Sequence, residues 1–303
     1  MKKLITHNGS FHTDDVFAAA TLSILLERQG EAVEIVRTRD ESLMKNADYV
    51  FDVGGIYDEA ANRFDHHQPG GAGGEAVPSK GEGQVKIEYS SFGLIWKKFG
   101  AELCGSQKVA DIVKNRLVAP IDAHDNGVDL VKNLTGVSQY IVQNIFFSMH
   151  PTWREDNITN DQMFFESVEI GKKILLREIA QSKDFVLAED IVISFYENAE
   201  DKRIIVWDKH YPCEDVLGKF PEPLFFVYPK SADGTWAVKA VRDDIKSFKN
   251  RKDLPASWAG LRDEELQKVS GVPDAVFCHR ALFVAVAKSK EGAIKLAQIA
   301  VEY

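Results

Sequence analysis

The chain has 303 residues, of which 45% are hydrophobic and 27% are charged, so we expect one large or two modest globular domains. Its formal net charge of −9 argues against a surface coated with basic residues for duplex DNA, but it is compatible with a local basic groove. Three widely spaced cysteines argue against a disulfide framework and against a thiolate zinc site. No apolar run approaches the length that spans a bilayer, and residues 1–5 lead directly into polar ones. We therefore expect no signal peptide, no membrane partner and a cytoplasmic location.

The first part of the chain alternates apolar strands with helices. Residues 4–6 predict a strand, and residues 16–26 predict a largely buried helix. Two further strands are expected at 32–38 and 47–53. This alternation indicates a parallel sheet, and ligand sites gather at the carboxyl ends of parallel strands. Here those ends carry His7, Arg37 and Asp52.

The pattern changes after Pro151, where residues 161–181 predict a long helix between two domains. Before it, residues 69–86 are rich in Gly and Pro and predict a mobile surface loop, and helices are expected at 90–96, 109–118 and 137–149. Beyond it, strands are expected at 203–207, 224–228, 236–241 and 283–287, with a closing helix from Ser289. The sequence therefore predicts an α/β fold. Residues 1–150 would form a parallel-sheet catalytic domain, and residues 151–303 a helical linker and a smaller α/β substrate-binding domain.

Four groups of Asp and His residues lie in the expected catalytic domain, separated by whole helices or strands. They are residues 7–15, Asp52, residues 65–67, and Asp122 with Asp125. Asp and His are ligands that Mn²⁺ accepts, and their convergence predicts a two-metal hydrolase site with ions about 3.5–4 Å apart. Simpler interpretations exist for the first three groups: Asp14 or Asp15 as a helix cap, Asp52 as a turn residue, and the histidines as surface side chains.

The ordered motifs carry a family resemblance. They are His7-x4-His12-x-Asp14, Asp52-Val53-Gly54-Gly55, Asp65-His66-His67, Ser90-Ser91-x-Gly93 and Ile121-Asp122-x2-Asp125-Asn126-Gly127. This series resembles that of the DHH phosphoesterase superfamily. Within it, the chain resembles the melanocyte proliferating gene 1 family of metal-dependent exonucleases that act on RNA. The resemblance covers nearly the whole chain and extends to Arg37-Thr38-Arg39-Asp40, Leu254-Pro255-x2-Trp258-x-Gly260-Leu261 and Ser270-Gly271.

The resemblance implies a set of metal ligands that would hold two Mn²⁺ or Mg²⁺ ions. They are His7, His12, Asp14, Asp52, His66 and Asp122. Asp125 is kept as an alternative to Asp122, because the sequence does not separate the two. Many superfamily members carry an aspartate where His12 stands, which leaves the metal preference open. His67 is expected behind the ligands or as a general acid near the leaving oxygen, and Ser90 and Ser91 are expected to bind substrate.

Basic residues suggest how a phosphate would be held. Arg37 and Arg39 follow a predicted strand on the ligand side, and guanidinium groups suit phosphate oxygens. The alternative is surface salt bridges with neighbouring acids. Residues 236–262 carry seven basic residues against three acidic ones, with interleaved aromatics, which is typical of a groove for single-stranded nucleic acid. The alternative is that the aromatics are core and the lysines solvated.

In this C-terminal part, Arg251 and His279 are expected to contact substrate. Superfamily C-terminal domains usually carry a glycine-rich turn before a histidine that binds substrate phosphate. Val276-Phe277-Cys278 replaces those glycines here, so a backbone amide cradle is not expected.

The resemblance and the ligand groups together predict a metal-dependent phosphodiesterase, a 3′-5′ exonuclease on single-stranded RNA or short oligonucleotides. The alternative enzyme is a small-molecule phosphohydrolase acting on dinucleotides, cyclic dinucleotides or pyrophosphate, which suits the acidic composition. It predicts a weak salt dependence of affinity, whereas a polymer groove predicts a steep one. A hypothesis of another class is a metal-binding regulator without catalysis. A metal-dependent protein hydrolase is not supported, because the sequence has no His-Glu-x-x-His helix. The oligomeric state stays open, a homo-oligomer included.

Overall fold

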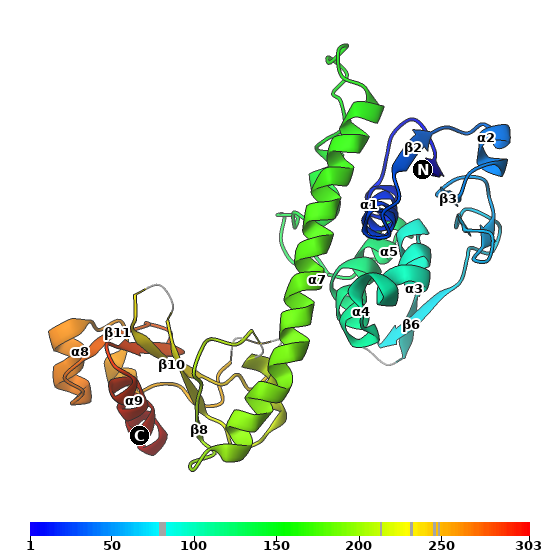
Figure 1. The fold of residues 1–303 in the computed structure, drawn as a ribbon. Helices are drawn as coiled ribbons and strands as arrows, with labels where there is room; N and C mark the ends of the chain where they lie inside the picture. The colour runs from blue at the N-terminus through cyan, green and yellow to red at the C-terminus, as the bar shows by residue number, and fades with distance from the viewer. Residues whose placement is uncertain (79–82, 213, 231–232, 245–246, 248) are drawn as a thin grey trace. The chain divides into compact units, whose positions relative to one another are not determined.

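The computed structural model describes residues 1–78, 83–212, 214–230, 233–244, 247 and 249–303. They form two compact units, which we call unit 1 (residues 1–183) and unit 2 (residues 184–303). Helix α7 (Asn160–Asn198) begins in unit 1 and ends in unit 2 (Figure 1). It continues well beyond residue 181, because Ala188 and Val192 extend its buried apolar face. The predicted α/β fold is confirmed, and a long helix is found where the sequence predicts one.

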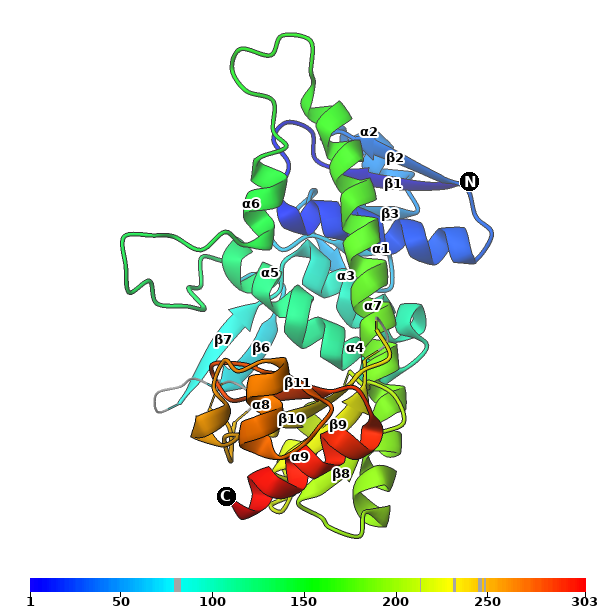
Figure 2. The ribbon, with the colours of Figure 1, turned by 90° about the vertical axis from the view of Figure 1, so that its left-hand side faces the viewer.

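Unit 1 contains a sheet with the strand order β2-β1-β3-β5-β4. Its strands β1, β2 and β3 are labelled in Figure 2. The strands are β1 (Lys2–Thr6), β2 (Val33–Arg37), β3 (Tyr49–Phe51), β4 (Tyr57–Asp58) and β5 (Arg63–Phe64). Every neighbouring pair is parallel except β4 with β5. The predicted parallel sheet is therefore confirmed. Because β1, β3 and β5 end at one edge, the residues after them, His7, Asp52 and Asp65, are brought together.

Helix α1 (Thr13–Arg28) is buried from Thr13 to Leu26, which explains why its sequence is apolar on all sides. It packs against α3 and against the first half of α7, where the missing side chain of Gly171 lets Val16 and Ala20 approach closely. The predicted ligands at the N-terminus of α1 are thus carried by a firmly packed helix. The other helical segments of unit 1 are α2 (Glu41–Lys45), α3 (Ser91–Cys104), α4 (Gln107–Val113), the π-helical η1 (Lys114–Val118), α5 (Ala119–Asp125) and α6 (Val142–Phe147).

Two local predictions in unit 1 are wrong. Residues 69–86 are not a loop throughout, since β6 (Gly74–Pro78) and β7 (Gln84–Glu88) pair as an antiparallel hairpin. Apolar Val85 and Ile87 alternate with polar residues in β7, and the glycines that precede this strand obscure the alternation. Residues 79–82 lie outside the described part of the chain. The helix expected at 137–149 is limited to α6.

Unit 2 contains a second sheet, with the order β11-β12-β10-β9-β8. Its strands are β8 (Ile204–Val206), β9 (Phe225–Pro229), β10 (Trp236–Ala240), β11 (Ala275–Cys278) and β12 (Val284–Ala287). Only β8 and β9 are parallel to each other. The remaining segments are η2 (Glu214–Lys219), η3 (Ala256–Trp258), α8 (Asp263–Ser270) and α9 (Lys290–Glu302).

Alternating side chains give the sheet of unit 2 two buried faces. Phe225 and Val227 belong to a core that includes residues of α9, whereas Phe226 packs with Trp207 and the last turns of α7. Such alternation is the period-2 pattern of a strand. None of the helices among the described residues is both long enough and apolar enough to cross a bilayer.

Candidate metal centre

The loop between β1 and α1, residues 7–12, carries the first predicted ligands. His7 is 5% exposed, whereas His12 is exposed at the N-terminus of α1. The backbone N–H of His12 donates to Asp15 Oδ1 at 2.9 Å, so Asp15 caps the helix, and Asp15 Oδ2 lies 3.3 Å from His7 Nε2. Asp14 is different, because both of its carboxylate oxygens are buried without a hydrogen-bond donor among the described residues. Of these two consecutive acids, Asp15 caps the helix and Asp14 is left without a partner.

Asp52 is the central carboxylate of the site. It follows β3 with a φ of +56°, a left-handed conformation in which Asp is found more often than most residues. Its Oδ2 lies 3.2 Å from His7 Nε2, and its Oδ1 lies 3.3 Å from His66 Nε2. Ser91 Oγ donates to Oδ1 at 3.2 Å. Burial alone would raise the pKa of Asp52, but the bonds from the two imidazoles outweigh it and hold this pKa well below its usual range.

The three residues after β5, Asp65, His66 and His67, have different roles. Asp65 accepts from the Gly55 N–H at 2.5 Å through Oδ2, and its Oδ1 lies 2.8 Å from His67 Nδ1. Asp65 therefore holds the turn after β3 and orients the His67 ring. His66 faces the site with Nε2 near Asp52, while the His67 side chain is 61% exposed. The two imidazole rings lie 4.3 Å apart.

Asp122 lies in the first turn of α5 and Asp125 is its last residue, and their surroundings differ. Asp125 Oδ2 lies 3.3 Å from His66 Nε2. Asp122 Oδ1 instead accepts from the N–H and Oγ of Ser90, at 3.1 and 2.6 Å. Burial raises the pKa of Asp122 to about 7, although the Ser90 bonds oppose this. A Cβ on Gly93 would collide with the Asp122 carboxylate, so this acid fills the space beside the start of α3.

The candidate ligand atoms form three groups, each with its atoms within 4.8 Å of one another. They are His7, His12 and Asp52; Asp52, His66 and His67; and His12, Asp14 and Asp125. Asp52 and His12 each belong to two groups, so the three are continuous. The structure thus brings together every predicted ligand except Asp122, which lies behind the site.

The electrostatics of this cluster fit a divalent cation. Burial, followed by the charges of Asp52, Asp125 and Asp15, raises the pKa of Asp14 well above its usual range. Burial would lower the pKa of His7, but its bonds to Asp15 and Asp52 prevail and raise it to about 10. Protons are therefore held on Asp14 and on the His7 imidazole, and divalent metal ions would replace them. Mixed imidazole and carboxylate donors, with both oxygens of Asp14 unpartnered, suit Mn²⁺.

Two cavities open on this cluster. One of about 380 Å³ is lined by His7, His12, Asp52 and His67 together with Arg39 and the Gly54-Gly55 turn. The other, about 210 Å³, is lined by His12, Asp14 and Asp125 and by further residues of α5 and α6. His12 lines both. The ligand groups therefore border two cavities that meet at His12.

Arg37 and Arg39, two residues apart, have different environments. The Arg37 side chain is 1% exposed; it donates to Asp161 Oδ1 at 2.6 Å and to the Gly9 carbonyl at 2.8 Å. Its guanidinium lies 4.6 Å from the centre of the Phe164 ring. Arg37 therefore ties the ligand loop to the start of α7, whereas exposed Arg39 lines the larger of the two cavities.

His150 is a second anchor of the same loop, and sequence reasoning missed it. Its Nε2 lies 2.8 Å from the Phe11 carbonyl, and its ring packs edge-on to Phe11 at 4.3 Å. Phe11 is fully buried between His7 and His12 in the sequence. A lone histidine before a proline carries no motif, so nothing in the sequence pointed to this contact.

The predicted substrate-binding residues all have partners within the protein. Ser90 and Ser91 are fully buried and donate to the carboxylates of Asp122 and Asp52. Arg251 Nη2 donates to the Gly218 carbonyl at 2.6 Å, and its Nη1 donates to the carbonyls of Phe220 and Pro223. His279 Nδ1 accepts from the Ala281 N–H at 3.0 Å. In the basic stretch, Trp258 is 2% exposed and belongs to the core, while Lys246 and Phe248 lie outside the described residues.

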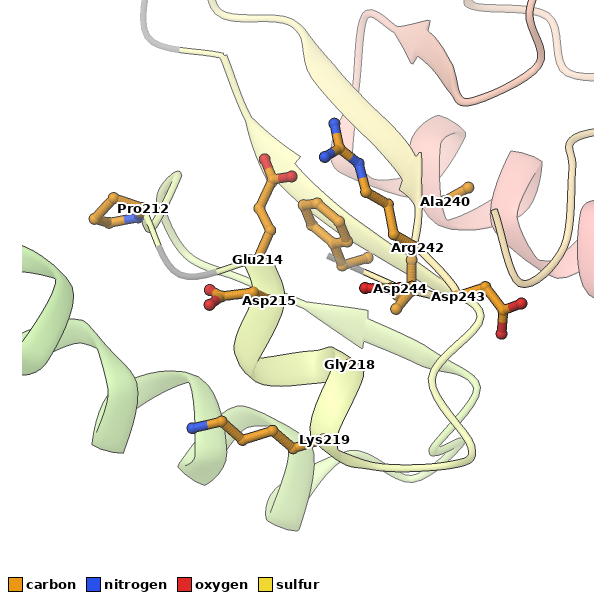
Figure 3. A pocket seen from close by; sticks show the side chains of 11 residues that line it. Pro212, Glu214, Asp215, Gly218, Lys219, Ala240, Arg242, Asp243 and Asp244 are labelled. Atoms are coloured by element: carbon orange, nitrogen blue, oxygen red, sulfur yellow. The ribbon is translucent and has the colours of Figure 1, made fainter. Parts of the chain in front are cut away.

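A larger cavity, about 480 Å³, lies in unit 2 between η2 and the end of β10 (Figure 3). Charged side chains of both signs surround it, Glu214, Lys219 and Arg242 among them. Glu214 bonds to Lys239 at 2.6–2.7 Å, and Lys219 bonds to Glu189 at 2.5 Å. The three metal-ligand groups found among the described residues all lie in unit 1, so this cavity is separate from them in sequence and in composition.

Comparisons with known proteins extend over the whole chain. The family model MYG1_exonuc, described as uncharacterised protein family UPF0160, matches residues 3–301. MYG1 exonuclease of Homo sapiens is 31% identical over 326 residues, which covers 97% of this chain and 84% of that protein. A MYG1 protein of Caenorhabditis elegans is 30% identical, with 98% and 94% covered. Among solved structures, RecJ of Thermus thermophilus in complex with Mn²⁺ aligns with all of this chain and 52% of its own, at 14% identity and a TM-score of 0.30.

Proposed function

The chain belongs to the MYG1 exonuclease family, which makes it a metal-dependent hydrolase, and we propose that it shortens single-stranded RNA or short oligonucleotides from the 3′ end. Two Mn²⁺ or Mg²⁺ ions, a cytoplasmic location and a substrate-binding role for residues 151–303 are parts of this proposal. A homo-oligomer is compatible with it.

One observation carries the proposal: the continuous cluster of His and Asp side chains, which includes the unpartnered carboxylate of Asp14. Such a cluster, open to two cavities, suits a hydrolytic centre better than a closed structural metal site, which leaves no room for water or substrate. Asp125 rather than Asp122 would complete the ligand set, because it lies in the group with His12 and Asp14.

When bound, two divalent ions would lower the pKa of an attacking water and stabilise charge on the leaving oxygen. The protein's own residues position the substrate. Arg39, at the wall of the 380 Å³ cavity, would donate to the phosphate oxygens. His67 lines the same cavity, and because Asp65 engages its Nδ1, a proton passed to the leaving group would come from Nε2. Arg37 would act on the ligand loop instead of the phosphate.

A small-molecule phosphohydrolase is the second candidate, and a specific observation favours it. The basic residues of the predicted groove largely bond to the protein: Lys239 to Glu214, Lys249 to Asp243, and Arg251 to backbone carbonyls. Cations held in this way neutralise fewer phosphates of a polymer. This candidate predicts a rate that depends weakly on salt, whereas release of counterions from RNA gives a steep dependence.

The deciding experiment is hydrolysis of a 5′-labelled single-stranded RNA in Mn²⁺, with and without EDTA, beside a dinucleotide and pyrophosphate. Asp14→Asn is the matched control, because it removes a charge without breaking a hydrogen bond of the described structure. A metal-dependent ladder that shortens from the 3′ end, absent in Asp14→Asn, is expected. Turnover of the small substrates alone would favour the second candidate, and turnover of none would refute both.

A further inference from the structure

We infer that the 210 Å³ cavity beside His12, Asp14 and Asp125 receives a nucleobase of the substrate, which stacks on Phe147. This inference rests on the proposed function, since it places the base next to the centre that would cleave the phosphodiester. The cavity joins ligand residues to an apolar and aromatic wall, formed by Ile121 and Phe147. Such a combination is what a nucleoside attached to a metal-bound phosphate requires.

Phe147 has the properties of a stacking residue. It ends α6 and stays 41% exposed, although its neighbour Phe146 is fully buried and anchors the helix. The rings of His124 and His150 lie 6.1 and 6.0 Å from it. An exposed aromatic ring beside a cavity is the surface on which single-stranded nucleic acids stack their bases. The sequence requires no aromatic residue here for packing, because Phe146 already fills the core.

Gln143 adds a polar group to the same wall. It is 3% exposed, and its Nε2 donates to the Pro120 carbonyl at 3.4 Å, which fixes the amide one turn before Phe147. A side-chain amide offers both a donor and an acceptor, which suits the edge of a base. The wall therefore combines stacking with hydrogen bonding.

The volume of the cavity suits one base rather than several consecutive nucleotides. At about 210 Å³ it is smaller than the roughly 300–1,000 Å³ of pockets for drug-sized ligands. The neighbouring 380 Å³ cavity shares His12 with it and holds Arg39 for the phosphate. One nucleotide can thus place its phosphate by the ligands and its base against Phe147.

The test compares AMP with ribose 5-phosphate, which carries a hydroxyl in place of the base, for binding to the Mn²⁺-loaded protein in calorimetry. The wild type is expected to bind AMP at least about tenfold more tightly, the order of one stacked base. Phe147→Leu should lose this preference and leave ribose 5-phosphate unchanged, while Phe147→Trp should keep it. Phe165→Ala is the matched control, because Phe165 is 43% exposed in unit 1 but does not line the cavity.

Equal affinities for the two ligands in the wild type, or a preference that survives in Phe147→Leu, would overturn the inference. Its failure is distinct from failure of the proposed function. RNA shortening without a base preference would remove the subsite alone. A base preference at Phe147 without any RNA cleavage would keep the subsite and refute the exonuclease.

Discussion

Replacing Asp52 by Asn and by Ala separates the two properties that this residue combines, its charge and its backbone conformation. Asp52 has a φ of +56°, which Asn adopts readily. Ala lacks a side chain that bonds locally, and its Cβ makes the left-handed conformation cost about 1–2 kcal/mol. Asp52→Asn therefore removes the charge with little backbone strain, and Asp52→Ala removes the charge and adds the strain.

The contacts of Asp52 set the expected size of the effect. Its carboxylate lies 3.2 Å from His7 and 3.3 Å from His66, but Asp15 and Asp125 each lie 3.3 Å from one of these imidazoles. Both histidines keep a carboxylate partner, so the metal-free protein should lose only about 1–3 kcal/mol of unfolding free energy in Asp52→Asn. Metal affinity should fall more than about 100-fold, since Asp52 belongs to two ligand groups and loss of residues that merely support ligands costs about 10- to 100-fold.

The assay pairs urea unfolding of the metal-free proteins with calorimetric titration of Mn²⁺. Asp52→Ala should be about 1–2 kcal/mol less stable than Asp52→Asn and should bind Mn²⁺ no better. An Asn variant that binds Mn²⁺ within threefold of the wild type would show that Asp52 is not a shared ligand. Equal stability of the two variants would refute the backbone argument.

Three further predictions follow from the site. Arg39→Ala should raise KM for RNA at least about tenfold in initial-rate measurements and leave Mn²⁺ affinity unchanged. Arg37→Ala should instead release the ligand loop and weaken Mn²⁺ binding about 10- to 100-fold in calorimetry. Asp125→Asn should weaken Mn²⁺ binding at least about tenfold in calorimetry, whereas Asp122→Asn should change it little, because the amide oxygen still accepts from the start of α3. The pKa of His7, raised to about 10, means that its proton stabilises the metal-free fold fully below about pH 6.5, an effect lost as pH rises through about 10. Mn²⁺ must displace this proton, so the Mn²⁺-induced rise in Tm should grow between about pH 6.5 and 9.

Each of these predictions has an outcome that contradicts it. Equal losses of Mn²⁺ affinity in Arg37→Ala and Arg39→Ala would deny them separate roles. A stronger metal defect in Asp122→Asn than in Asp125→Asn would return Asp122 to the ligand set. A Tm shift that is flat or declines with pH would mean that His7 does not exchange its proton for metal.

The ligand clusters could be predicted from the sequence because the information is local. Short apolar strands alternate with helices, and in a parallel sheet this order alone places the residues after β1, β3 and β5 at one edge. Contacts between distant segments could not be predicted in this way. Asp161 lies 124 positions from Arg37, and His150 lies 139 positions from Phe11, and neither carries a motif. The hairpin of β6 and β7 was missed because its alternation lies within a glycine-rich segment.

Arg37 and Arg39 show most clearly where sequence reasoning ends. The two arginines lie two residues apart in one motif, and an extended strand that ran through both would place their side chains on the same face. The structure separates them because β2 ends at Arg37, which pairs in register with Thr6, the last residue of β1. That register puts Arg37 beside the ligand loop, where Gly9, Asp161 and Phe164 enclose it. Arg39 lies beyond the last paired residue and is left exposed at the cavity. The chemistry of a guanidinium is the same at both positions, so the strand end decides which arginine supports the ligands and which is available to a phosphate.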